Sequence, residues 1–346
     1  MAFHVPQIDI SPYVNDGSAE EKAAVAAAVD TACREVGFIQ IVGHGIPTDV
    51  SAGLASAMDD FFGMDLDAKK QYRTPPSVNR GYAPPKTESL SLSLGVESAS
   101  RMNDFFEAFN IGDSAGMHPD LDLPKDAYTE NVWPDSVPTF EPKVSTYYEQ
   151  ARRVAQTMVD IFEDALGVEE GTLSGLTGHS IDVMRMNNYA LPPGEIELDG
   201  DLTGMGEHTD YGIVTVLWAD QVKGLQVLGT DGGWHDVAPI DGALLINLGD
   251  VTARLTNEKW MSTLHRVKPP IVDGTIERRR SAAFFHDGDY DAVVAPLAVC
   301  IDEGEHAIYE PITVGEHIAQ KLAGSRAGKK NTTAVREAAR VGAASS

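Results

Sequence analysis

The chain has 346 residues, of which 42% are hydrophobic and 23% charged, so it is long enough for a large core and disorder cannot dominate. Its formal net charge of -25 argues against a nucleic-acid backbone or an anionic membrane as its main partner. The two cysteines, Cys33 and Cys300, lie far apart, which disfavours a disulfide framework, a cysteine zinc site and an iron–sulfur cluster.

The amino-terminal residues carry no basic stretch followed by an apolar run, so we expect no signal peptide and a cytoplasmic protein. No apolar stretch approaches about 18 residues, and we expect no membrane span. Ser18 and Glu21 form a capping-box signal that predicts a helix, and Gly37 stands where that helix should end. A short apolar strand is predicted at residues 38–42, and a second helix at about residues 48–62.

Residues 74–138 are rich in Pro, Ser, Asp and Gly, which predicts long loops that cover part of the molecule. The clearest helix is predicted over about residues 142–166, where an apolar stripe indicates a buried face. Between about residues 182 and 290, short β-rich runs alternate with turn signals, which is typical of a sandwich or jelly roll. After about residue 324 the tail is basic and Ala-rich, and we expect it to be loosely ordered.

A possible metal site lies in the β-rich part of the chain. On an extended backbone His208 and Asp210 face the same side, so both can reach one metal ion. His265, inside another short β-like run, is the candidate third ligand. Two histidines and one carboxylate leave coordination positions open, which suits iron(II) that must bind a cosubstrate and O₂, whereas structural zinc sites are closed. A lone histidine would more often be a hydrogen-bonded core residue.

Arg279 and Ser281 introduce an apolar strand, and alternation places them on one face with Arg280 on the other. A guanidinium beside a hydroxyl suits a carboxylate, because the fork binds both oxygens and the hydroxyl donates a further hydrogen bond. The alternative is a basic surface cluster, which we accept for Arg278 and Arg280. The apolar residues that follow suggest that Arg279 is buried, and a buried arginine needs an anionic partner.

With these residues in this order, the sequence resembles the isopenicillin-N-synthase-like branch of the 2-oxoglutarate- and iron(II)-dependent dioxygenases. The resemblance covers most of the chain. Further segments that look like that family are residues 5–9, 37–47, 79–82, 186–189 and 247–250. No one segment is specific, and it is their combination that makes the match strong.

The resemblance implies a mixed, β-dominated fold in which a helical amino-terminal region packs on a double-stranded β-helix, or jelly roll. The family's iron ligands carry over to His208, Asp210 and His265, with no catalytic residue beyond them. Its contacts to the 2-oxoglutarate carboxylate carry over to Arg279, Ser281 and Tyr189. The resemblance thus implies an enzyme that uses Fe(II), 2-oxoglutarate and O₂ to oxidise a C–H bond of a small molecule, releasing succinate and CO₂. Because related halogenases leave the position of Asp210 vacant for chloride, halogenation is not expected.

We divide the chain into four parts. Residues 1–115 form the amino-terminal region with lid loops, and residues 116–180 a connecting segment with the long helix. Residues 181–290 form the jelly-roll core, and residues 291–346 a carboxy-terminal segment with the basic tail. The candidate substrate contacts, each as readily explained by packing or by a solvated loop, are Tyr82, Phe105, Phe106 and His286, with Asp287 beside the last of them.

Two rival functions stay open at this point. The first is an iron oxidase of the same fold that makes no use of 2-oxoglutarate, because in isopenicillin N synthase the equivalent Arg-x-Ser pair grips a substrate carboxylate. The second is a catalytically silent metal- or ligand-binding jelly roll. The sequence indicates neither the substrate, nor a choice among hydroxylation, desaturation and ring closure, nor the oligomeric state.

Overall fold

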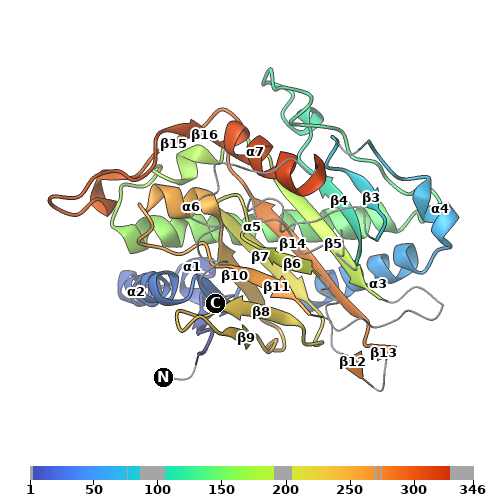
Figure 1. Ribbon diagram of the computed structural model, residues 1–346, viewed down its shortest axis with the longest axis horizontal. Coiled ribbons are helices and arrows are strands. Elements are labelled where there is room, and N and C mark those ends of the chain that lie inside the picture. Colours follow the sequence, from blue (N-terminus) through green and yellow to red (C-terminus); the bar gives the residue numbers. More distant parts are fainter. Residues whose placement is uncertain are drawn as a thin grey trace.

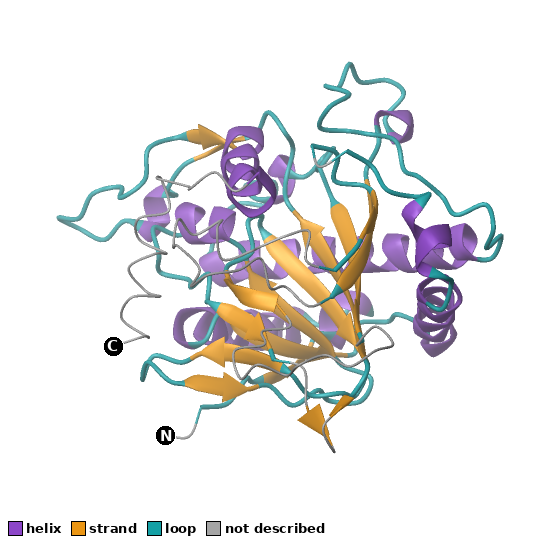
Figure 2. Ribbon diagram, turned by 45° about the vertical axis from the view of Figure 1, so that its right-hand side comes forward, coloured by secondary structure: helices purple, strands orange, loops and turns teal. Residues whose placement is uncertain are grey.

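The computed structural model describes residues 3–75, 77–85, 106–190, 205–268, 271–272 and 275–327. Two β-sheets of unequal size face each other, and helices cover the outer side of the larger one (Figures 1 and 2). This arrangement confirms the predicted jelly roll with a helical amino-terminal region. We expected a loosely ordered tail after about residue 324, but a helix continues to residue 327. The tail beyond residue 327 lies outside the described residues.

The larger sheet has eight strands, which are in spatial order β1 (Gln7–Asp9), β2 (Phe38–Val42), β10 (Leu244–Leu248), β7 (Val214–Ala219), β14 (Arg279–His286), β5 (Val183–Tyr189), β4 (Glu107–Gly112) and β3 (Gly81–Ala83). The smaller sheet has four, which are β6 (Met205–His208), β11 (His265–Val267), β8 (Leu225–Leu228) and β9 (Trp234–Asp236). Two short hairpin-like pairs complete the described strands, namely β12 (Ile271–Val272) with β13 (Thr275–Ile276) and β15 (Val293–Val294) with β16 (Ile312–Thr313).

The described helices are α1 (Ser11–Val14), α2 (Ala19–Glu35), α3 (Thr48–Phe62), α4 (Leu66–Lys70), α5 (Phe140–Leu166), α6 (Asp250–Leu255) and α7 (Val314–Ala327). Short 3₁₀ turns occupy Ala115–Met117, Ser174–Leu176 and Ala298–Cys300. The capping box predicted at the start of α2 is present, because Ser18 Oγ accepts from Glu21 N and the Glu21 carboxylate accepts from Ser18 N. Gly37 follows the helix with a φ of 71°, a conformation that L side chains rarely adopt.

The long helix α5 organises the core behind the larger sheet. It packs on β7 and β14 of the larger sheet and against α2 and α3, which also contact that sheet. Figure 2 shows helices behind the sheet. The apolar stripe of α5, including Val144, Tyr148 and Phe162, is buried almost completely. Gly167 ends the helix in the left-handed conformation, with a φ of 66°. The helix predicted over residues 142–166 is thus confirmed, and it holds the larger sheet in place from outside.

The prediction of loops throughout residues 74–138 was wrong in part. β3 and β4 lie inside that stretch and extend the larger sheet beyond β5. The polar residues of these two strands resemble those of loops, but their side chains form hydrogen bonds and an ion pair within the protein. The Glu107 carboxylate accepts from Lys69 Nζ at 2.7 Å and from the Tyr82 hydroxyl at 2.6 Å, and Asn110 donates to the side chain of Asn79. Buried polar groups with partners are compatible with a strand inside a sheet.

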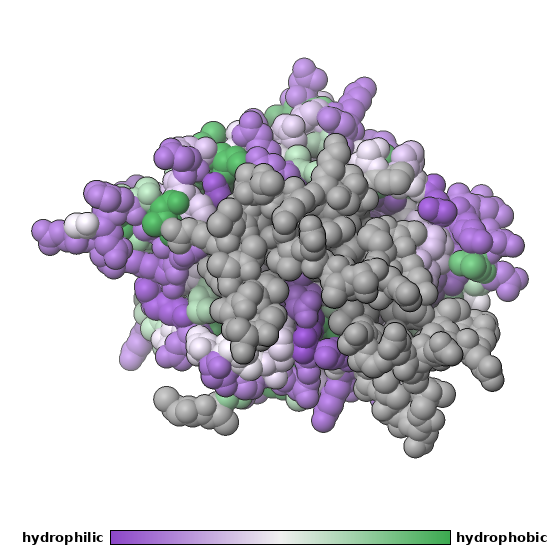
Figure 3. All heavy atoms as spheres, in the orientation of Figure 1, coloured by the Kyte–Doolittle hydropathy of each residue, from purple (hydrophilic) through white to green (hydrophobic). Residues whose placement is uncertain are grey.

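None of the described helices combines the length and the apolar character needed to cross a lipid bilayer. On the face shown in Figure 3, the described surface is mostly hydrophilic, with small separate apolar areas. A surface of this kind accords with the large negative charge of the chain.

Candidate active site

A cavity of about 300 Å³ is lined by residues of both sheets and of α7. Alternate residues of β5 and β14 form one wall, because side chains two apart on a strand face the same side. The opposite wall comes from β6, β8 and β11 and carries two histidines. Residues from the two walls and from α7 include Arg185, Tyr189, Ser281, His208, Leu225 and Ile318.

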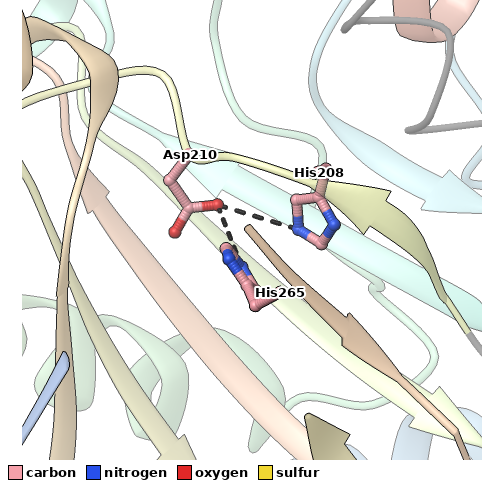
Figure 4. A group of neighbouring side chains, drawn as sticks. All are labelled: His208, Asp210 and His265. Atoms are coloured by element: carbon pink, nitrogen blue, oxygen red, sulfur yellow. Dashed lines mark ion pairs between the residues drawn. The ribbon is translucent and has the colours of Figure 1, made fainter. Parts of the chain in front are cut away.

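His208, Asp210 and His265 converge in this cavity (Figure 4). His208 ends β6 and His265 begins β11, and these two residues are direct partners across the antiparallel strands. Asp210 lies two residues beyond β6. Its Oδ1 atom is 3.8 Å from Nε2 of His208 and 3.6 Å from Nε2 of His265. One ligand atom from each residue lies within 4.8 Å of the others, and all three side chains are buried.

The two histidines are oriented by backbone carbonyls. Nδ1 of His208 lies 2.8 Å from the Gly206 oxygen, and Nδ1 of His265 lies 3.0 Å from the Thr263 oxygen. Since a carbonyl oxygen only accepts, Nδ1 carries the proton and Nε2 keeps its lone pair for a metal. Burial, followed by the charge of the neighbouring His265, lowers the pKa of His208 to about 3. The neutral imidazole that ligates metal is therefore the favoured form of His208.

The Asp210 carboxylate is fixed by two donors on the larger sheet. Oδ2 accepts from Thr215 Oγ1 at 2.5 Å and from Asn247 Nδ2 at 2.6 Å. Thr215 lies on β7 and Asn247 on β10, which are neighbouring strands. Both bonds engage the same oxygen, so the other oxygen is left to face the two histidines. The donor set thus fits a metal that takes two neutral nitrogens and one carboxylate oxygen on one side and leaves its other side open.

Arg279 is the second notable group of the cavity. It is 3% exposed, and among the described residues its Nε and Nη1 atoms have no hydrogen-bond partner. Its guanidinium lies 5.3 Å from the ring centroid of Tyr189, the residue that it faces across β5 and β14. Ser281, two residues on, is buried and lines the same cavity, whereas Arg280 points the other way and pairs with Asp59. The predicted alternation of the strand is therefore correct.

The structure keeps three of the predicted substrate contacts out of the cavity lining but places Asp287, beside His286, in that lining. Of the four, Phe105 lies outside the described residues, and the other three are not among the described residues that line the cavity. The Tyr82 hydroxyl is occupied by the Glu107 carboxylate. Phe106 packs 5.5 Å from the ring of Tyr189. His286 points into the core, because Nδ1 lies 2.9 Å from the Asp182 carboxylate.

Two cavity groups had escaped the sequence analysis. Arg185 on β5 is 8% exposed and lines the cavity, with its Nε donating to Asn187 Oδ1 and its guanidinium 5.0 Å from the centroid of the Phe106 ring. The second is α7, whose inner residues close one end of the cavity. Only the alternation around Tyr189 on β5 could have pointed to Arg185.

A buried ion pair links α7 to the segment that carries Thr209 and Asp210. Lys321 Nζ lies 2.6 Å from the Asp250 carboxylate, and both side chains are buried. The same carboxylate accepts from Thr209 Oγ1, and the Asp250 amide donates to the Asp210 carbonyl oxygen at 2.9 Å. The segment between His208 and Asp210 is thus tied to the helix that covers the cavity.

Comparison with known proteins agrees with this geometry. Residues 5–136 match a family model described as non-haem dioxygenase in morphine synthesis N-terminal, and residues 181–288 match the 2OG-Fe(II) oxygenase superfamily. The chain is 33% identical over 320 residues to the 2-oxoglutarate-Fe(II) type oxidoreductase hxnY of Emericella nidulans, covering 90% of this chain and 88% of that one.

Two solved structures have the same fold. A full-length Neurospora crassa protein in complex with alpha-KG superposes with a TM-score of 0.80 at 25% identity, covering 92% of this chain and 95% of that one. A putative 2OG-Fe(II) oxygenase family protein from Caulobacter crescentus gives a TM-score of 0.77 at 26% identity, covering 92% of this chain and 98% of that one.

Proposed function

Because the chain belongs to the 2OG-Fe(II) oxygenase superfamily, we propose that His208, Asp210 and His265 bind its iron(II) and that Arg279 binds 2-oxoglutarate. The chain is a 2-oxoglutarate- and Fe(II)-dependent dioxygenase that oxidises a C–H bond of a small molecule and releases succinate and CO₂. The assignment of roles to particular residues rests on the geometry of the cavity.

The iron assignment is supported by the way the three ligands are held. Both histidines present Nε2, and Asp210 presents Oδ1, because their remaining polar atoms are occupied by Gly206, Thr263, Thr215 and Asn247. Such fixed partners orient ligands before the metal arrives. Iron(II) bound there would activate O₂, which is the oxidant for the C–H bond while 2-oxoglutarate is oxidised to succinate and CO₂.

The 2-oxoglutarate assignment is carried by Arg279. A buried guanidinium is costly unless an anion offsets its charge, and the described residues offer Nε and Nη1 no partner. The cosubstrate's distal carboxylate fits this group, since a guanidinium fork binds both oxygens at once. Ser281 is placed to donate a further hydrogen bond from the same face of β14, and Tyr189 forms the adjoining wall.

The rest of the cavity positions the substrate and excludes water. Phe38, Leu217, Leu225 and Val267 give part of the cavity an apolar surface. A dry cavity strengthens the charged contacts made inside it and protects a strong oxidant from side reactions. The helix α7, held by the buried pair of Lys321 and Asp250, covers one end.

A comparison of two charge-conserving variants tests the 2-oxoglutarate site. Arg279→Lys keeps the charge but loses the fork, so we expect it to weaken 2-oxoglutarate binding by about 1–3 kcal/mol. Arg280→Lys is the matched control, because Arg280 lies on the opposite face and contacts Asp59 and Asp220. Anaerobic titration of 2-oxoglutarate into each iron-loaded variant reports binding without needing the substrate.

Three outcomes would contradict the proposal. If Arg280→Lys weakens 2-oxoglutarate binding and Arg279→Lys does not, the cosubstrate has been assigned to the wrong face of the strand. If the iron-loaded wild type binds no 2-oxoglutarate, the oxidase alternative replaces it, and O₂ consumption without succinate formation would identify that enzyme. A protein that binds iron but consumes no O₂ would be the silent jelly roll.

A further inference from the structure

Asp287 occupies the end of the cavity opposite Arg279. It follows β14 directly and continues the alternation of cavity-facing residues that begins at Arg279. At about 3.3 Å per residue, eight residues of extended chain separate the two by about 26 Å. Arg279 and Asp287 therefore mark opposite ends of one elongated cavity, and only the Arg279 end is used by the proposed cosubstrate contacts.

The Asp287 carboxylate has no hydrogen bond or ion pair within the described parts of the chain. The side chain is 8% exposed, and the one bond given for the residue is from its backbone amide to Asp182. The two nearby carboxylates, Asp182 and Asp210, both accept hydrogen bonds from other side chains. Asp182 accepts from Ser180 and contacts His286, and Asp210 accepts from Thr215 and Asn247. Of these three carboxylates, Asp287 alone has neither oxygen engaged by a donor among the described residues, whereas Asp210 has Oδ2 engaged and Oδ1 facing the two histidines.

This arrangement is unfavourable without a ligand. Burial, followed by the charges of Asp182 and Asp210, raises the pKa of Asp287 well above its ordinary value. The side chain lies against Gly212, where an added Cβ would be 2.0 Å from Oδ1, so a glycine at that position leaves room for the carboxyl group. A buried carboxylate that lines a binding cavity gains most from a cation or an N–H donor brought by the ligand.

We propose that Asp287 binds a protonated amino group of the substrate, so that the enzyme oxidises small organic amines held between Asp287 and the metal ligands. This inference rests on the proposed function. The exposed Asp126 also lines the cavity, and the net charge of -25 attracts cations towards it. Arg185 would serve an anionic substrate instead, but its guanidinium already contacts Asn187 and the Phe106 ring.

The test uses matched sets of an amine, an alcohol and a carboxylate on the same carbon skeletons of four to ten carbons. Succinate formation is measured with each compound for the iron-loaded wild type, Asp287→Asn and Asp291→Asn. Asp291 is the matched control because its side chain is 78% exposed and pairs with His179. We expect amines to stimulate succinate formation at least about 10-fold more than their partners, with this preference lost in Asp287→Asn and kept in Asp291→Asn.

Thermal unfolding of the ligand-free variants separates a binding role from a structural one. If Asp287 serves the ligand, Asp287→Asn unfolds at the same or a higher temperature than wild type, because an unfavourable buried carboxyl is removed. A lower unfolding temperature together with a retained amine preference would overturn the inference. A preference for carboxylates that depends on Arg185, or basal succinate formation that no amine stimulates, would also overturn it while leaving the proposed function intact. Absence of succinate formation under all conditions would instead overturn the proposed function.

Discussion

Replacing Thr215 by valine tests whether its hydrogen bond to Asp210 holds this proposed metal ligand in place. Valine matches the shape of threonine and suits a strand, so the change removes one hydrogen bond and little else. Thr215 Oγ1 supplies one of the two donors to Asp210 Oδ2, at 2.5 Å. A hydrogen bond to a charged group is worth about 1.5–3 kcal/mol, and the loss of such an outer partner usually lowers metal affinity about 10–100-fold. Those two ranges agree, since each tenfold corresponds to about 1.4 kcal/mol.

The assay is anaerobic equilibrium dialysis against iron(II), with thermal unfolding measured in parallel. Thr256→Val is the matched control. Thr256 is fully buried and its Oγ1 donates to the Thr252 carbonyl oxygen at 2.9 Å, but it lies at the end of α6 and makes no contact with Asp210. We expect Thr215→Val to lower iron affinity about 10-fold or more, whereas Thr256→Val lowers only the unfolding temperature. Equal iron affinity in wild type and Thr215→Val would refute the reasoning, as would an equal loss in both variants.

Three other changes have definite expected outcomes. His265→Ala should abolish iron binding while shifting the unfolding temperature little, which dialysis and calorimetry would report, and full turnover in this variant would remove His265 from the site. Lys321→Met should cost about 3–5 kcal/mol in urea unfolding, because the buried Asp250 loses its cation. The stability of Asp287→Asn relative to wild type should grow as pH rises above about 3.8, since the unfolded carboxyl ionises there while the folded one, with its raised pKa, resists ionisation. A difference that shrinks with rising pH would contradict that burial argument.

The proposed metal triad was accessible from the sequence because its residues obey local rules. His208 and Asp210 are two residues apart beside a strand, and His265 begins another short strand. The alternation that separated Arg279 from Arg280 is likewise a property of any extended segment. What the sequence lacked was the pairing of β6 with β11, which brings the two histidines opposite each other.

Other features depend on partners far apart in the chain. The strand β4 lies in a stretch whose Pro, Ser, Asp and Gly content predicted loops, and its Glu107 is paired with Lys69, 38 residues earlier. His286 looked suited to the cavity mouth, but Asp182, 104 residues earlier, holds it in the core. Periodicity and spacing report local geometry, and such long-range polar pairs become visible only when the sheets are assembled.

A crystal structure of the protein grown without oxygen in the presence of iron(II) and 2-oxoglutarate tests the central claim most directly. Anomalous scattering at the iron edge locates the metal independently of any assumption about its ligands. The account requires one iron peak bonded to His208, Asp210 and His265, with a carboxylate of 2-oxoglutarate on the Arg279 guanidinium. An iron peak held by other residues, or a 2-oxoglutarate carboxylate bound away from Arg279, would contradict it.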